Sequence, residues 1–166
     1  MLRILIGKTF TTLACLGAIA AAPASAQTEA AGRFLSVDGE LRVLGGNGAR
    51  AAQRGSEVRQ GETVRTGSSA LAQLRMSDGS LLSVRSGSEF KLDQYSFSGK
   101  GDSNATFALS VIRGGFRTIT GLIAQANRRG YRITTPVATI GVRGTHFEVV
   151  HVVPQMATQG APAGTY

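Results

Sequence analysis

The sequence predicts an all-β domain, built either as an antiparallel two-layer sandwich or as a flattened β-roll. Apolar and polar residues alternate along most of the chain, which is the periodicity of strands with one buried face. Turn residues interrupt this alternation about every ten positions, as in sandwiches, barrels and rolls. No stretch has the spacing of a long amphipathic helix or of a coiled coil. The sequence therefore predicts a single domain of this class.

The first half of the chain predicts strands joined by Asp-Gly turns. Residues 33–37 and 40–44 flank Asp38-Gly39, a dipeptide suited to the two-residue turn of a hairpin. Asp78-Gly79 offers the same device further on. The apolar faces expected to enter the core belong to residues 70–76, 80–84, 90–92 and 105–111.

The second half predicts further strands and one short helix. Gly114-Gly115 breaks the alternation before a strand at 116–120, and residues 121–129 have room for a helical turn that Gly130 ends. The last expected strands are 131–135, 137–142 and 145–153. Pro136 separates the first two and, lacking an N–H, belongs at an edge or a corner.

The N-terminal residues 1–26 have the three parts of a secretory signal peptide. Arg3 and Lys8 form a basic head, 9–22 is uncharged and mostly apolar, and Ala24-Ser25-Ala26 fits a cleavage site. We therefore expect a mature protein from Gln27, placed in the periplasm or secreted and not spanning the membrane. An uncleaved anchor is the alternative.

Cys15, the one cysteine of the chain, lies inside this leader. Leu13-Ala14-Cys15 weakly resembles a lipoprotein box, so lipidation is a minor alternative. The mature domain, expected over residues 27–153, then has no disulfide, redox or thiolate chemistry. We expect 154–166 to be a flexible tail, and Gly164-Thr165-Tyr166 suggests a further strand of a truncated chain.

Positive charge concentrates in the second half. The formal charge of +8 falls by two, to +6, when Arg3 and Lys8 leave. An exported protein rarely meets nucleic acid, so an anionic lipid, a polysaccharide or an acidic protein face is the expected counterpart, with simple solubility as the plain alternative. The candidate face for an anionic partner consists of Arg113, Arg117, Arg128, Arg129 and Arg132.

Catalytic and metal sites are not expected. His146 and His151 are five apart on one strand and so point to opposite faces, which leaves His146 and Glu148 as two ligands at most. No serine lies in a nucleophile elbow. The candidate carboxylates each suit a turn or a solvated strand face, and these are Asp78, Asp93 and Asp102.

A glycine-rich loop at residues 46–51 fits the letters of a dinucleotide fingerprint. That motif needs a crossover helix of a parallel βαβ unit, and none is expected in this chain. We therefore expect no cofactor.

One ordered run carries a resemblance to a known family: Ile133-Thr134-Thr135-Pro136-Val137-Ala138-Thr139-Ile140-Gly141-Val142-Arg143-Gly144-Thr145-His146-Phe147-Glu148-Val149. It resembles the FecR domain family, the periplasmic part of regulators tied to ferric citrate uptake. Further matching pieces are residues 61–67, 70–76 with Asp78-Gly79-Ser80, Leu92 with Tyr95, and 112–115. Together they cover about Phe34 to Val149.

Within this run, Gly141 and Gly144 bracket Arg143, ahead of Thr145. A tight, glycine-flanked corner suits an arginine that satisfies several backbone carbonyls at once. We therefore favour a structural role for Arg143 over a ligand-binding role.

The resemblance implies a sensing or interaction module without catalysis. Membrane-bound members resemble a three-part device with a cytoplasmic segment that controls a sigma factor, one membrane helix and this periplasmic domain. This chain resembles a secreted, free-standing form. The expected partner is an envelope protein, either a membrane sensor or an outer-membrane receptor, bound by edge-strand addition. The alternative is an anionic cell-wall or outer-leaflet polysaccharide or lipid.

Overall fold

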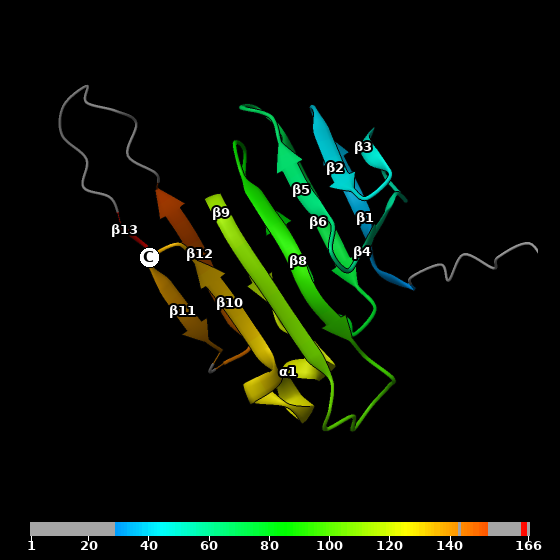
Figure 1. Cartoon of the computed structure of the whole chain (residues 1–166), viewed down its shortest axis with the longest axis vertical. Helices are drawn as coiled ribbons and strands as arrows, with labels where there is room; N and C mark the ends of the chain where they lie inside the picture. Colours follow the sequence, from blue (N-terminus) through cyan, green and yellow to red (C-terminus); the bar gives the residue numbers. More distant parts are fainter. Residues whose placement is uncertain (1–28, 143, 153–163, 166) are drawn as a thin grey trace, which may run out of the picture.

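The chain folds as a strongly curled, mostly antiparallel β-sheet with one short helical connection (Figure 1). The computed structural model describes residues 29–142, 144–152 and 164–165. The predicted leader at 1–26 and most of the predicted tail therefore lie outside the described residues. The elements are β1 Ala30–Asp38, β2 Leu41–Gly45, β3 Gly48–Ala51, β4 Glu57–Arg59, β5 Thr63–Thr66, β6 Leu71–Met76, β7 Leu81–Val84, β8 Glu89–Ser96, β9 Thr106–Ile119, α1 Leu122–Ala126, the 3-10 turn η1 Arg128–Gly130, β10 Tyr131–Thr135, β11 Ala138–Gly141, β12 His146–Val152 and β13 Gly164–Thr165.

The sheet has two layers that share the long strand β9. We call layer A the order β4-β1-β6-β7-β9-β12-β13, and layer B the order β3-β2-β5-β8-β9-β10-β11. The first half of β9 pairs with β8 and β10, and its second half pairs with β7 and β12. This arrangement confirms the predicted all-β, two-layer fold.

Gly114 and Gly115 are the point where β9 passes from layer B to layer A. Gly114 has φ +72°, and a Cβ there would lie 2.5 Å from Ser88 Oγ. A Cβ on Gly115 would lie 2.3 Å from the Val149 carbonyl oxygen. Ser88 Oγ bonds this corner on both sides, because it accepts from Gly115 N–H and donates to the Gly115 carbonyl, each at 2.9 Å. The Gly-Gly pair is therefore required by close backbone approach.

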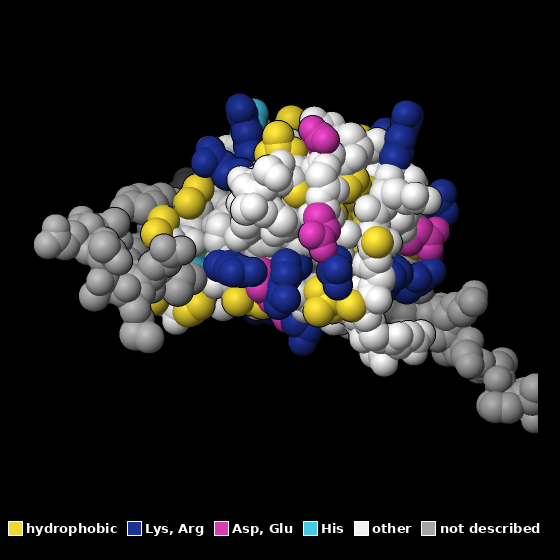
Figure 2. Space-filling model, turned by 90° about the horizontal axis from the view of Figure 1, so that it is seen from above, with side chains coloured by type: hydrophobic (Ala, Val, Ile, Leu, Met, Phe, Trp, Pro, Cys, Tyr) yellow, Lys and Arg dark blue, Asp and Glu magenta, His cyan; other side chains and the backbone are white. Residues whose placement is uncertain are grey.

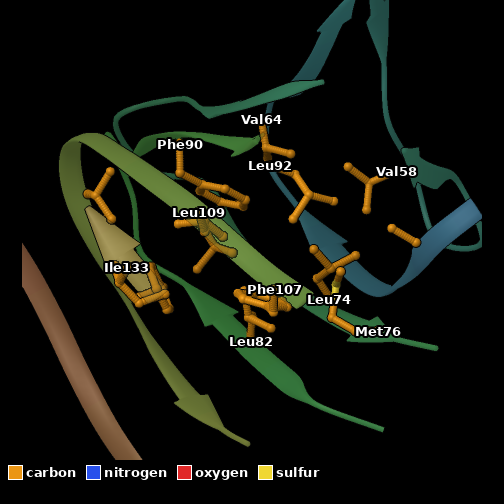
Figure 3. Packing of buried hydrophobic residues seen from close by; sticks show 14 of the residues in the cluster. Val58, Val64, Leu74, Met76, Leu82, Phe90, Leu92, Phe107, Leu109 and Ile133 are labelled. Carbon is orange, nitrogen blue, oxygen red and sulfur yellow. The ribbon is translucent and has the colours of Figure 1, made fainter. Parts of the chain in front are cut away.

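The core lies between the two layers (Figure 3). Ring contacts join the layers on both sides of β9: Phe90 of β8 lies 6.1 Å from Phe116, and Tyr131 of β10 lies 6.3 Å from Phe147 of β12, centroid to centroid. The inward faces predicted for residues 70–76, 80–84, 90–92 and 105–111 are the buried ones. Alternation along the sequence therefore predicted the core correctly.

The two Asp-Gly turns have different outcomes. Asp78-Gly79 joins β6 and β7, which pair as a hairpin, as predicted. Asp38-Gly39 does not make a hairpin, and that prediction was wrong: β1 pairs with β4 and β6, and β2 pairs with β3 and β5. Gly39 has φ +83° and packs its backbone against Ala70, so this turn sends the chain from one layer to the other.

Among the described strands one pair is parallel, which corrects the expectation of a purely antiparallel sheet without a βαβ unit. β10 runs parallel to the first half of β9, with Tyr131 opposite Phe107. The connection contains only α1 and η1. The β6–β7 turn fixes the start of α1, since Leu122 N–H donates to the Asp78 carbonyl at 2.9 Å and Gly121 N–H donates to Ser80 Oγ at 2.8 Å.

Candidate interaction surfaces

The run that carries the family resemblance forms the β10–β11 hairpin and the chain that follows it. Pro136 and Val137 make the two-residue turn, where Thr135 Oγ1 accepts from Ala138 N–H at 3.1 Å. Pro136 therefore sits at a corner, as predicted. Beyond β11, Gly144 has φ +135°, and Thr120 N–H donates to the Thr145 carbonyl at 2.9 Å. This bond ties the run to the end of β9.

Of the two remaining residues of this motif, the structure describes Gly141 but not Arg143. Arg143 lies outside the described residues, so its corner role stays a prediction. Gly141 is the last residue of β11, opposite Arg132, and no atom lies within 4 Å of a Cβ built on it. Its side of the strand is open.

β11 is an edge strand with an unusual composition. Among the described residues it pairs with β10 alone, and its side chains are Ala138, Thr139 and Ile140 followed by Gly141. Val137, at its start, is 67% exposed. The edge strands β3 and β4 carry charge, with Arg50 in β3 and with Glu57 and Arg59 in β4. β12, which pairs with β13 only at His151 and Val152, carries Glu148. Charged side chains on an edge discourage pairing with other chains, so β11 lacks a protection that β3, β4 and β12 have.

The five arginines of the candidate anionic-partner face lie in three places. Arg113 and Arg132 are exposed on layer B, Arg117 is exposed on layer A, and Arg128 and Arg129 are exposed in η1. Figure 2 likewise shows basic side chains in separate places on the face that it draws, with acidic and apolar ones between them. The structure brings only Arg128, Arg129 and Arg132 into one stretch.

The outer face of layer A mixes arginines with apolar side chains. Arg117 donates from Nε to His146 Nε2 at 2.7 Å, and Arg85 pairs with Glu148. Leu71 and Ile119, both about half exposed, lie on the same face. Apolar residues scattered singly among charges are normal for a protein surface and identify no ligand.

The two histidines and Asp78 lie apart in the fold, each in a different setting. His146 is exposed and His151 is buried, so the two point to opposite faces, as predicted. Within the described residues, no group of three His, Cys, Asp or Glu side chains could hold a metal ion. Asp78 is buried, and its carboxylate accepts from Ser80 N–H at 3.0 Å and from Ser80 Oγ at 2.8 Å. Asp78 therefore fixes the turn beneath α1.

A row of side chains across layer B was missed in the sequence. Strand register places Arg42 of β2 beside Arg65 of β5, Arg65 beside Glu89 of β8, and Glu89 beside Arg113 of β9. Each arginine alone is an ordinary residue on the solvated face of a strand. Only the pairing register, which no short-range pattern specifies, could have revealed the row.

Comparison with known proteins places most of the chain in a family. The family model described as FecR protein matches residues 62–159, more than half of the 166 residues. No curated protein and no solved structure matches. No helix in the described part of the chain is long and apolar enough to cross a membrane. The matched residues contain the β10–β11 hairpin, the Gly114-Gly115 corner and the Asp78 turn, and the chain belongs to the FecR protein family.

Proposed function

We propose that this chain is a non-catalytic interaction module of an envelope signalling system, and that it binds a protein partner by accepting a strand at β11. FecR membership supports the signalling role, since the family is a regulatory domain. The leader expected at residues 1–26 supports a place in the periplasm or outside the cell. A membrane sensor or an outer-membrane receptor is the kind of partner that meets the chain there.

One observation carries the proposal: β11 is uncharged, whereas β3, β4 and the part of β12 that β13 does not pair with carry charged side chains. Partner strands add to sheet edges through main-chain hydrogen bonds, and the pockets for alternate side chains then give specificity. A bare edge is an aggregation risk that proteins usually avoid. An uncharged edge strand at β11 is expected if this edge is a binding site.

The register identifies which backbone groups face a partner. A two-residue turn makes Thr135 and Ala138 the hydrogen-bonded closing pair, and such pairs alternate with pairs whose N–H and C=O groups turn outward. Thr139, opposite Thr134, therefore directs its N–H and carbonyl to the free edge. Ala49 of β3 holds the same position after the Gly46-Asn47 turn at the opposite end of layer B.

The test uses Thr139 and Ala49 as a matched pair. A photo-crosslinking amino acid at position 139 should capture one partner protein in cells that make the chain, whereas the same residue at position 49 should not. With the purified partner, Thr139→Pro removes the outward N–H and should weaken binding by about tenfold. Ala49→Pro should leave the affinity unchanged.

Two controls keep the result clear. Thermal unfolding of both proline variants shows whether each hairpin survives, and Thr139→Lys, which keeps the N–H but adds charge at the edge, should also weaken binding. Equal crosslinking at both positions, or unchanged affinity in Thr139→Pro and Thr139→Lys, would reject strand addition at β11.

A second function is favoured by the grouping of Arg128, Arg129 and Arg132, all exposed and within one short stretch. Binding of an anionic polysaccharide or lipid through these side chains is the alternative. It predicts an affinity that falls steeply as salt rises, because exposed charges are screened. Strand addition predicts little salt dependence.

A further inference from the structure

The row of charged side chains on layer B contains more positive than negative charge. Arg42 pairs with Glu40, Nε to Oε1, at 2.8 Å. Arg65 and Arg113 share a single acid, Glu89, at 2.7 Å and 3.2 Å. Three guanidinium groups thus face two carboxylates, which leaves one positive charge in the cluster.

Glu89 holds two of the guanidinium groups in place. Its Oε1 accepts from Arg65 Nη2 and its Oε2 pairs with Arg113 Nε, so each oxygen serves one arginine. The Glu89 side chain is 13% exposed, because it lies between the two arginines on the sheet surface. A guanidinium has five N–H donors, so both arginines keep donors for another acceptor. Groups fixed in this way lose less side-chain freedom when a ligand binds.

A hollow adjoins the three arginines. It has a volume of about 430 Å³ and is lined by the three arginines, by Glu40, which is paired with Arg42, and by Thr66, Gly67, Ser68 and Gly87. Nothing lies within 4 Å of a Cβ built on Gly87, so the hollow is open at that turn. Its volume falls within the range of small-molecule sites.

We propose that this hollow is a binding site for an oxyanion group, a carboxylate or a phosphate, of a small ligand. The planar fork of arginine matches both groups, and three forks from three strands converge on one cavity. An isolated surface ion pair would carry no such inference, since exposed pairs are common and contribute little. What distinguishes this cluster is the unbalanced charge beside a hollow. The site contains no residue of β11, and it does not depend on the proposed strand addition.

The test measures binding of two probes to the purified chain, inorganic phosphate and malonate, with chloride keeping the ionic strength constant. Backbone amide NMR signals of Gly67, Ser68 and Gly87 should shift in a saturable way with at least one probe. Arg65→Gln and Arg113→Gln should each weaken that binding by about tenfold or more, since each loses charge-assisted hydrogen bonds. The matched control is Arg75→Gln, which removes the same charge from an exposed position on layer A.

A further pair of variants separates the fork from the charge. Arg65→Lys and Arg113→Lys keep the charge and should still weaken binding, because an ammonium cannot replace a fork. Response to malonate alone identifies a carboxylate ligand, and response to phosphate alone identifies a phosphate ligand. The site is rejected if neither probe shifts the three amides, or if Arg75→Gln weakens binding as much as Arg65→Gln. The site would also be rejected if the chain binds polygalacturonate but neither small anion, and if Arg65→Gln and Arg113→Gln leave that polygalacturonate binding unchanged.

Discussion

In layer B, the strands on each side of β9 end in a hairpin with a two-residue turn, but one outer strand is charged and the other is uncharged. On one side β8, β5 and β2 lead to β3, and on the other side β10 leads to β11 (Figure 1). Arg50 of β3 forms a bidentate pair with Glu62 at 2.5 Å and 2.9 Å, and it also donates to the Glu57 carbonyl at 2.8 Å. The β11 edge has no charged side chain. The outer strand β3 is thus held by side-chain hydrogen bonds to the neighbouring chain, whereas β11 has no charged side chain that could form such bonds.

Two tyrosines that pack against the same phenylalanine in the core show a similar difference between the two sides of β9. Tyr95 of β8 and Tyr131 of β10 contact Phe107 from either side, with ring centroids 6.0 Å and 4.4 Å away. The Tyr95 hydroxyl bonds Ser77 Oγ at 2.8 Å and accepts from Asp78 N–H at 2.9 Å. The Tyr131 hydroxyl is buried, and no atom meets it in hydrogen-bond geometry. The β3 side is therefore the better satisfied, and we expect it to be the more stable.

The largest effect is expected from Gly115→Ala, which strains the strand that both sides share. Its Cβ would meet the Val149 carbonyl oxygen at 2.3 Å and the Val150 Cα at 3.0 Å, and backbone atoms cannot move aside cheaply. The free energy of unfolding, measured by urea denaturation, should fall by about 3 kcal/mol or more. Native-state hydrogen exchange should show the β10–β11 amides losing protection before those of β2–β3.

Gly141→Ala is the control on the open side. No atom lies within 4 Å of its Cβ, and its φ is not positive, so stability should stay the same or rise by about 0.5 kcal/mol. Equal losses for both alanine variants would mean that close packing does not set the requirement for glycine at position 115.

Glu62→Gln should remove the anchor of the β3 side. Glu62 loses its charge pair with Arg50 and weakens as the acceptor of Arg59 N–H, now at 2.8 Å. We expect stability at pH 7 to fall by about 1–3 kcal/mol. Arg33 and Glu57, an exposed pair, give the control, since Arg33→Gln should cost well under 1 kcal/mol. Similar losses for the two variants would contradict the contrast between the sides.

The Glu62 anchor also has a predictable pH dependence. Burial alone would raise the pKa of Glu62, but hydrogen bonds from Arg50 and from Arg59 N–H outweigh it, so the pKa lies below its ordinary 4.5. A carboxyl with a lowered pKa in the folded state stabilises the fold fully above 4.5, and this contribution is lost as the pH falls through the folded-state value. The stability difference between the native chain and Glu62→Gln should therefore shrink below pH 4.5. A constant difference down to pH 3 would contradict the shift.

The sequence predicted the elements better than their connections. Period-two alternation identified which faces of β6, β7, β8 and β9 enter the core, because burial on one side of a strand leaves a local pattern. The Asp38-Gly39 turn was assigned to a hairpin because Asp-Gly suits such turns, yet the same φ > 0 glycine also suits a corner between layers. Which use occurs depends on Ala70, far away in the sequence.

The candidate sites divide in the same way. The Pro136 corner and the opposite directions of His146 and His151 follow from local rules, and both were predictable. The parallel pairing of β10 with β9, and with it the exposed β11 edge, was not predictable, because it depends on how Asp78 and Ser80 hold the start of α1. The cluster of Arg42, Arg65 and Arg113 around Glu89 likewise exists only once three strand registers are known.

Apart from the controls, the smallest expected effect is also the most direct test of the contrast, because Tyr131→Phe and Tyr95→Phe should change stability in opposite directions. Burial raises the pKa of Tyr131, and its buried hydroxyl has no partner in hydrogen-bond geometry among the described residues. Burial likewise raises the pKa of Tyr95, to about 12, but its hydroxyl has two partners. Removing an unpaired buried hydroxyl should raise the free energy of unfolding by up to about 1 kcal/mol, and removing a paired one should lower it by about 1 kcal/mol. Urea denaturation of both variants gives the comparison, with the Phe107 contacts expected to survive in each. If Tyr131→Phe destabilises the chain as much as Tyr95→Phe does, the two sides of β9 are equally satisfied and the open side needs another explanation.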